Sequence, residues 1–265
     1  MKFNQEFLRQ YMGVAPLALA FERVMECRIL SSMPFDRPIL DIGCGEGLFA
    51  KMLFAEKIDT GIDPNPREIE RSREWDAYTE LIVCKGDAIA KPDGHFQTIF
   101  SNSVVEHIPE LEPVLREAHR LLAKGGRLYL TVPSAKFDQY TLGNEILSTL
   151  GLKSLAARFR NFYNRFWRHY HYHSRKDWET IAHRAGFEVV TSRTYAPRSV
   201  CLFNDILVPF SALELLTKRL FNRWTLFPRV RRVVLFPVYL LARAILRDAE
   251  ETTDGGLVFI ALTKK

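Results

Sequence analysis

The residues best suited to chemistry follow an apolar run at Ile39–Ile42. They form a glycine-rich turn, Asp41-Ile42-Gly43-Cys44-Gly45-Glu46-Gly47, that leads into an apolar stretch of helical character at 48–54. Glycines let the backbone turn sharply and approach a ligand closely. Because such turns also occur as structural turns and at other nucleotide sites, this turn predicts a ligand only together with further signals.

Two acidic residues supply those signals. Asp63 ends the next apolar run, twenty positions after Gly43 (63 minus 43), where a carboxylate can accept both hydroxyl protons of a ribose. Asp87 follows the third run, where it can accept a hydrogen bond from the exocyclic amine of adenine. Because the carboxyl ends of parallel strands meet at one edge of a sheet, these residues predict an adenosine ligand there. The turn has no lysine, which argues against a phosphate-binding loop.

In these motifs the chain resembles the class I SAM-dependent methyltransferases. The family's first motif is similar to the turn from Asp41 to Gly47, its second ends at Asp63 and its third matches Asp87. The stretches 100–108 and 121–133 also look like the family's fourth strand and its entry into the fifth. The likeness covers about 38–133 well and implies S-adenosyl-L-methionine as the cofactor, with methyl transfer as the reaction.

The resemblance also implies roles for single residues. Asp41 and the backbone around Gly43 and Gly45 would face the methionine part, and Asp63 would hold the ribose. Asp87 and Ala88 would frame the adenine, and Ser101 and Asn102 would lie beside the sulfonium and amino groups. The full set of expected cofactor-binding residues is Asp41, Gly43, Cys44, Gly45, Asp63, Pro64, Asp87, Ala88, Ser101 and Asn102.

Histidines are the candidates for a general base, which an oxygen or nitrogen acceptor can require. His169, His171 and His173 alternate, so an extended segment would place them on one face. We name His171, His173 and His107 as candidate catalytic residues. A lid that packs over the cofactor, or a metal site, would use the same alternating pattern. No carboxylate-rich motif accompanies these histidines, so no metal is predicted.

The segments expected to form the acceptor pocket are two insertions. The first is rich in basic and aromatic residues between 153 and 176, and the second carries an apolar run at 233–242 between arginines. We predict a small-molecule or lipid-linked acceptor, methylated at a hydroxyl in a glycan or lipid pathway. The 196–254 segment is expected either to touch a membrane surface or to cap the pocket as an ordinary helix pair. Nucleic acid is not predicted as a partner, because no recognised binding motif is present.

Two other functions fit parts of the pattern. An NAD(P)-dependent dehydrogenase would also use the glycines and Asp63, and Tyr172 with Lys176 resembles a short-chain dehydrogenase pair. That hypothesis leaves Asp41 unexplained. A non-catalytic binding module could keep the same fold.

The elements that must position these residues alternate between strand and helix. Apolar runs at 39–42, 59–63, 81–84, 96–100, 127–132, 187–191 and 257–263 predict seven strands. Asn65, Pro66 and Glu68 indicate a helix start, and an apolar stripe from Leu111 to Leu122 predicts a helix closed by Gly125-Gly126. The fold class is α/β, a doubly wound Rossmann-like sheet, mostly parallel with an antiparallel last strand, plus helical insertions.

We expect one methyltransferase domain over 1–265. Its parts are leading helices (1–37), a SAM-binding core (38–134), a first insertion (135–176), a helix and strand (177–195), a second insertion or lid (196–254) and a last strand (255–265).

Composition is that of an ordinary globular protein. The chain has 265 residues, 47% of them hydrophobic, a formal charge of +6 and four cysteines. The cysteines show no metal or disulfide spacing, which favours a reducing compartment. The uncharged stretch 11–21 loosely imitates a signal peptide, but a leading helix through Leu30 is the better interpretation. We therefore expect a cytoplasmic location, including contact with the inner face of the membrane.

Overall fold

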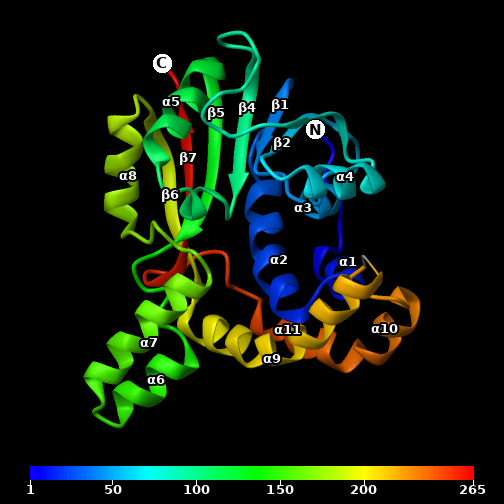
Figure 1. The fold of residues 1–265 in the computed structure, drawn as a ribbon, viewed down its shortest axis with the longest axis vertical. Coiled ribbons are helices and arrows are strands. Elements are labelled where there is room, and N and C mark those ends of the chain that lie inside the picture. The colour runs from blue at the N-terminus through cyan, green and yellow to red at the C-terminus, as the bar shows by residue number, and fades with distance from the viewer. Residues whose placement is uncertain (222) are drawn as a thin grey trace.

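The structure, a computed structural model, describes residues 1–221 and 223–265 and is built around a seven-stranded sheet (Figure 1). The strand order is β3-β2-β1-β4-β5-β7-β6. The strands are β1 (Ile39–Ile42), β2 (Ile58–Asp63), β3 (Tyr78–Val83), β4 (Phe96–Asn102), β5 (Leu122–Pro133), β6 (Glu188–Pro197) and β7 (Gly255–Thr263).

The direction of the strands follows the predicted pattern. Strands β1 to β5 pair in parallel, whereas β7 runs antiparallel to both β5 and β6. The chain moves outward from β1 to β3 on one side and continues from β4 on the other. Open α/β sheets bind ligands at such a switch point, outside the carboxyl ends of the strands. The predicted fold class is confirmed.

Helices cover both faces of the sheet because both faces of its strands are apolar. One face packs Phe100, Tyr129 and Phe259 against the leading helices, and the other packs alternate residues such as Leu128 against Trp178. The covering helices are α1 (Phe7–Val14), α2 (Leu17–Ser31), α3 (Leu48–Leu53), α4 (Pro66–Trp75), α5 (Leu111–Leu121) and α8 (Arg175–Arg184), with the short 3-10 helix η1 at Val105–His107.

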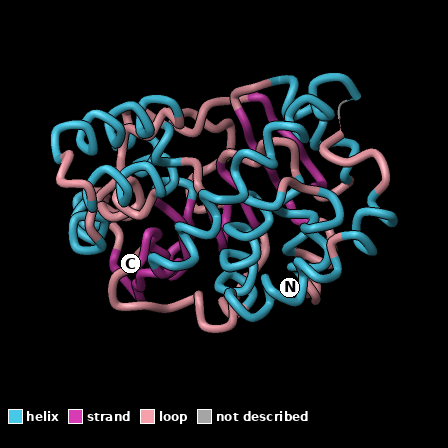
Figure 2. The backbone as a smooth tube through the Cα atoms, turned by 90° about the horizontal axis from the view of Figure 1, so that it is seen from below, coloured by secondary structure: helices cyan, strands magenta, loops and turns pink. Residues whose placement is uncertain are grey.

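The two insertions are helical and lie beyond the carboxyl ends of the strands, as Figures 1 and 2 show. The first leaves β5 and contains α6 (Leu142–Thr149) and α7 (Lys153–Phe166). The second leaves β6 and contains α9 (Arg198–Phe221), α10 (Pro228–Val234) and α11 (Phe236–Ile245) before the chain returns as β7.

The start of α4 agrees with its sequence signals, with one difference. Asn65 caps the helix by accepting a hydrogen bond from the backbone N–H of Arg67 at 3.0 Å. Glu68 does not complete a capping box, because its carboxylate is bonded to Arg71. The backbone N–H of Asn65 instead donates to Asp63 at 2.8 Å, which ties the helix start to the end of β2.

Strands β3, β5 and β6 extend furthest beyond their predicted bounds. β3 begins at Tyr78 and includes the polar Thr79 and Glu80, which an edge strand can leave exposed. β6, the other edge strand, continues past Thr191 in the same way. β5 begins directly after α5, and the pairing with β4 shifts register between Phe96 and Thr98. Gly125, at φ 73°, therefore belongs to an irregularity within the strand and does not close the helix.

We predict that Phe100→Ala destabilises the protein by about 3–5 kcal/mol, because Phe100 is fully buried among Phe35, Phe49 and Phe54 and its loss leaves a cavity. Urea unfolding measures the change. The matched control is Phe162→Ala, at a side chain 63% exposed, which should cost less than about 0.5 kcal/mol. A loss at Phe100 below about 1 kcal/mol would contradict this account of the core.

Candidate functional site

The glycine-rich turn joins β1 to α3 in a conformation that glycine favours. Gly43, Gly45 and Gly47 have φ values of 81°, 52° and 80°. A Cβ at Gly43 would lie 2.4 Å from a methyl carbon of Val104, whereas a Cβ at Gly45 would meet nothing within 4 Å. The turn is therefore packed on one side and open at Gly45, where a ligand can approach the backbone.

Backbone hydrogen bonds hold this turn against β2. The N–H groups of Gly43 and Cys44 both donate to the carbonyl oxygen of Ile62, at 2.9 and 2.8 Å. The Cys44 side chain is buried, and burial raises the pKa of its thiol. Cys44 thus contributes through its backbone and keeps a neutral side chain.

Asp63 connects the turn to the end of β2. Its Oδ2 accepts from the Gly45 N–H at 3.1 Å, and its Oδ1 accepts from the Asn65 N–H at 2.8 Å. Each carboxylate oxygen can accept two hydrogen bonds, so each keeps capacity for one hydroxyl. Pro64, beside it, and Asp87 and Ala88, which follow β3, are exposed. The strand order brings these residues to one edge, as the sequence predicts.

Asp41 lies deeper than the resemblance implies. It is 3% exposed, and its Oδ2 accepts a hydrogen bond from the Tyr78 hydroxyl at 2.7 Å. Burial raises the pKa of Asp41 to about 7, although the bond from Tyr78 opposes the shift. Asp41 therefore supports the turn from beneath.

Ser101 and Asn102, at the end of β4, are buried and bonded within the protein. The Ser101 hydroxyl donates to the carbonyl of Ile42 at 2.8 Å. The Asn102 amide donates to Glu26 at 2.8 Å and accepts from Thr131 at 2.9 Å. Their side chains fix the strand ends beside the site.

Glu26 is the centre of a buried polar network that sequence reasoning missed. It is fully buried on α2 and lies 2.6 Å from Arg23, 2.9 Å from the Ser103 hydroxyl and 3.1 Å from the Tyr195 hydroxyl. The network thus joins α2 to the ends of β4 and β6. A signal was present, since Glu22, Arg23 and Glu26 interrupt an otherwise apolar helix.

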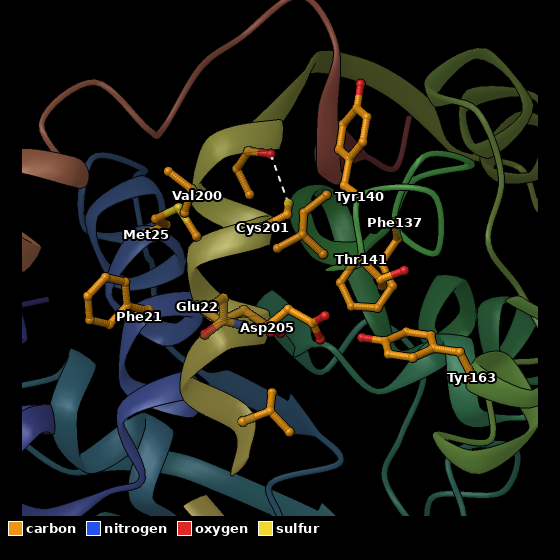
Figure 3. A pocket seen from close by; sticks show the side chains of 14 residues that line it. Phe21, Glu22, Met25, Phe137, Tyr140, Thr141, Tyr163, Val200, Cys201 and Asp205 are labelled. Carbon is orange, nitrogen blue, oxygen red and sulfur yellow. Dashed lines mark hydrogen bonds between the residues drawn. The ribbon is translucent and has the colours of Figure 1, made fainter. Parts of the chain in front are cut away.

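A pocket of about 330 Å³ opens beside this network. Its floor includes polar groups from the ends of α2 and β4, and its walls come from α7, α9 and the segments that follow them. The lining residues that matter here are Glu22, Arg23, Ser103, Glu106, His107, Tyr163, Trp167, His169, Leu215 and Trp224. A small cavity of about 40 Å³, shown in Figure 3, adjoins this pocket, because both are lined by Glu22, Phe137, Tyr163, Asn204, Val208 and Leu257.

The carboxyl groups in these spaces are shifted toward their neutral forms. Burial raises the pKa of Glu22 to about 7 and that of Glu106 to about 8, although Arg23 opposes both shifts. Burial also raises the pKa of Asp205, whose Oδ2 accepts a hydrogen bond from the Leu142 N–H at 2.8 Å. The Oε2 atom of Glu106 has no hydrogen-bond partner within the protein. The negative charge of these carboxyl groups is therefore reduced at neutral pH, and Arg23 adds a positive charge to the pocket lining.

Two histidines line the pocket. The rings of His107 and His169 lie 5.1 Å apart, and Nδ1 of His107 is 3.3 Å from the carbonyl oxygen of Arg168. That contact makes Nδ1 the donor and leaves Nε2 unprotonated. Burial lowers the pKa of His107, and burial together with His107 lowers the pKa of His169 to about 4.

His171 and His173 lie elsewhere. Nε2 of His171 is 2.9 Å from the carbonyl oxygen of Ile108, and the His173 ring packs on Trp178 with 5.1 Å between centroids. Neither residue lines the pocket, so the alternating histidines do not act as one group. Tyr172 and Lys176 do not line it either. Across residues 1–221 and 223–265 there is no group of three or more His, Cys, Asp or Glu side chains that could hold a metal ion.

The second insertion is bonded to the glycine turn. The Trp224 indole N–H donates to Oε1 of Glu46 at 2.6 Å, and the Lys218 ammonium lies 2.9 Å from Oε2. The same ammonium lies 4.0 Å from the centre of the Trp224 ring. These contacts tie the second insertion to the turn, and Trp224 also lines the pocket.

Comparisons with known proteins identify the family of this chain. A family model described as a methyltransferase domain matches residues 17–192. Ubiquinone biosynthesis O-methyltransferase of Vibrio campbellii is 26% identical over 112 residues, 40% of this chain and 48% of that protein. 27-O-demethylrifamycin SV methyltransferase of Amycolatopsis mediterranei is 33% identical over 108 residues, 36% and 40% of the two chains. The chain thus spans about half the length of the curated relatives it matches.

Solved structures share the fold. A SAM-dependent methyltransferase from Thermotoga maritima, described as a possible histamine N-methyltransferase, has a TM-score of 0.56 at 16% identity and covers 94% of this chain and 92% of its own. The [4+2]-cyclase SpnF has a TM-score of 0.57 at 16% identity, with 95% and 83% covered. At this identity the likeness concerns the fold alone.

We predict that Glu26→Ala lowers the free energy of unfolding by about 3–5 kcal/mol, because it leaves the largely buried Arg23 guanidinium with only the more distant Glu22 carboxylate, at 3.5 Å. Thermal and urea unfolding measure the loss. The control is Glu112→Ala, which removes an ion pair with Arg116 whose side chains are 74% and 60% exposed, and should cost less than about 1 kcal/mol. Equal losses for the two variants would show that the Glu26 network does not hold the site.

Proposed function

Because the chain belongs to the methyltransferase domain family, we propose that it transfers a methyl group from S-adenosyl-L-methionine to a small-molecule or lipid-linked acceptor, at a hydroxyl oxygen. The observation that carries this proposal is the pocket at the ends of β4 and β5, which is lined by His107 and by Trp224, the residue that bonds Glu46 of the glycine turn. Bound S-adenosyl-L-methionine would supply an electrophilic methyl on a sulfonium sulfur.

The residues of the turn suit this cofactor. Gly45 leaves its backbone open to a ligand, and Asp63 keeps hydrogen-bonding capacity on both carboxylate oxygens for the ribose hydroxyls. Asp87 and Ala88 are exposed where an adenine would lie. Because the ligand is cationic and zwitterionic, carboxylates and carbonyls suit it better than a phosphate-binding lysine would.

The pocket favours a neutral acceptor with an apolar body. Its walls include Trp167, Leu215 and Trp224, and the raised pKa values of Glu22 and Glu106 reduce the negative charge that would attract a cationic amine. Four of the relatives are named as O-methyltransferases of ubiquinone biosynthesis. An apolar molecule or lipid-linked glycan with one reactive hydroxyl fits these features.

The proton of that hydroxyl would pass to His107. The bond from Nδ1 to the Arg168 carbonyl fixes the ring and leaves the lone pair of Nε2 as acceptor. The oxygen then forms its bond to the methyl carbon as the carbon–sulfur bond breaks, and the proton remains on Nε2. Glu106, with Oε1 3.7 Å from Nε2, lies close enough for its ionised form to stabilise the imidazolium.

We predict that Asp63→Ala weakens binding of S-adenosylhomocysteine by about 1.5–3 kcal/mol, because the ribose loses its hydrogen-bonded pair. Titration calorimetry measures the affinity. Asp59→Ala is the control, since Asp59 lies on the same strand but bonds Arg37 and the Ile39 N–H at the far end. If Asp63→Ala bound S-adenosylhomocysteine with wild-type affinity, the assignment of Asp63 to the ribose hydroxyls would be wrong.

We further predict that His107→Gln lowers kcat about 10²–10⁴-fold while S-adenosylhomocysteine still binds. Label from methyl-labelled S-adenosyl-L-methionine, followed into lipid, glycan and small-metabolite fractions, measures turnover. His171→Gln is the control and should retain activity. Incorporation only into protein or RNA would overturn the proposed acceptor class.

The pH profile gives an independent test of the same residue. His107 must be neutral to accept the proton. Because its pKa is lowered from the ordinary value of 6.5, the ring stays mostly neutral at pH 6.5. Wild-type kcat/KM should therefore hold at neutral pH and fall only below pH 6.5. A fall in wild-type kcat/KM that begins above pH 7 as the solution is acidified would contradict the role of His107 as base. The same fall in the His107→Gln variant would contradict it too.

A further inference from the structure

The outer surface of the second insertion exposes many large apolar side chains. Val233 is 75% exposed and Phe227 is 70% exposed, although both belong to a segment of ordinary helices and short turns. We call the following set the outer face: Leu216, Leu220, Phe221, Leu226, Phe227, Val230, Val233, Val234, Phe236, Leu240 and Leu241. Most other exposed apolar residues of comparable size among the described residues lie in the first insertion.

Helix α10 exposes all three of its valines and turns one of its three arginines inward. Arg231 points inward, where it pairs with Glu214 and donates to the carbonyl oxygens of Met12 and Ala15 at 2.7 and 3.0 Å. Val230 and Val234 point outward, at 60% and 68% exposure. A surface helix normally buries valines and exposes arginines, so this face is suited to an apolar partner.

The positive charge around the outer face indicates which kind of partner fits it. Between 206 and 247 the only acidic residue is Glu214, and Arg231 already neutralises it. Exposed arginines surround the apolar side chains, at Arg219, Arg223, Arg229, Arg232, Arg243 and Arg247. A second copy of the chain would bring these like charges together. The complementary partner is both apolar and anionic, as the surface of an anionic bilayer is.

A groove of about 400 Å³ gives this surface a place for one lipid. It lies between α1 and the start of α11, with Arg9 and Arg232 among its polar groups and Met12, Leu235 and Phe236 among its apolar ones. The Arg232 side chain lies across Gly13, where a Cβ would come within 2.6 Å of its Nε. A phosphate between guanidinium groups with a hydrocarbon chain beside them matches this lining.

We propose that the outer face docks the protein on an anionic membrane surface, with its aliphatic and aromatic side chains among the acyl chains and its arginines at the head groups. No single helix in the described part of the chain is long and apolar enough to span a membrane; only Arg198–Ser211 with Glu214–Phe221, bent by 47°, meets the length and composition criteria as a pair. Docking along the surface uses the helices as they are folded. Because α9 also lines the pocket through Val208 and Ser211, the proposed docking surface and the proposed acceptor site share one helix.

Vesicle sedimentation of the full chain tests this proposal without any methyl transfer. One set of vesicles is phosphatidylcholine, and the other is three parts phosphatidylcholine to one part phosphatidylglycerol. We expect the protein to sediment with the anionic vesicles, to stay in solution with the neutral ones, and to release as salt is added. The variant carrying Val233→Glu and Val234→Glu should lose at least about tenfold in partitioning.

The matched control is Val190→Glu, which adds a carboxylate at a valine 61% exposed on β6. It should bind vesicles like the wild type, and circular dichroism should show all three proteins folded. Lack of sedimentation with anionic vesicles at low salt would overturn the proposal, as would equal binding by the double variant. A dimer in light scattering that the double variant abolishes would assign the face to a second copy instead. Binding of S-adenosylhomocysteine is measured in parallel. A protein that binds S-adenosylhomocysteine but not vesicles contradicts the docking proposal alone and leaves the proposed reaction unaffected.

Discussion

The position of the site depends on the hydrogen bonds and the ion pair of the buried Glu26 carboxylate. Glu26 lies on a leading helix, yet it accepts hydrogen bonds from Asn102 and Ser103 at the end of β4 and from Tyr195 on β6, and it pairs with Arg23. A fully buried charge is tolerable only when such partners surround it. Because Glu26 needs these partners, α2 must lie against the edge of the sheet where the strands have their carboxyl ends. That position makes α2 one wall of the pocket, with Glu22 and Arg23 facing into it.

The sheet and the insertions contribute different parts of the proposed reaction. The sheet brings the glycine turn, Asp63 and Asp87 to one edge, and this arrangement follows from strand order. The insertions supply the rest of the pocket, and Trp224 bonds one of them to Glu46 in the turn. The SpnF cyclase shares the fold, which shows that strand order alone does not determine the chemistry. The neutral His107 beside the pocket is the feature that favours proton removal from a hydroxyl acceptor.

Much of the fold was predictable because its signals are local. Apolar runs predicted the strands, the cap at Asn65 predicted the start of α4, and the glycine turn with its neighbouring motifs indicated the family. The site beyond that edge was less accessible, because it depends on contacts between distant segments. Spacing alone grouped His169 with His171 and His173, whereas the structure pairs His169 with His107, sixty-two positions away (169 minus 107), and turns His171 to the Ile108 carbonyl. Asp41 could not be placed without knowing that Tyr78 lies beneath the turn.

A crystal structure of the protein with S-adenosylhomocysteine tests the central claim most directly. The account predicts the ribose hydroxyls on the Asp63 carboxylate, the adenine beside Asp87 and Ala88, and the sulfur directed toward the pocket that His107 lines. A ligand bound away from the glycine turn would contradict it. So would a complex in which the sulfur is separated from that pocket, because no acceptor held there could then receive the methyl group.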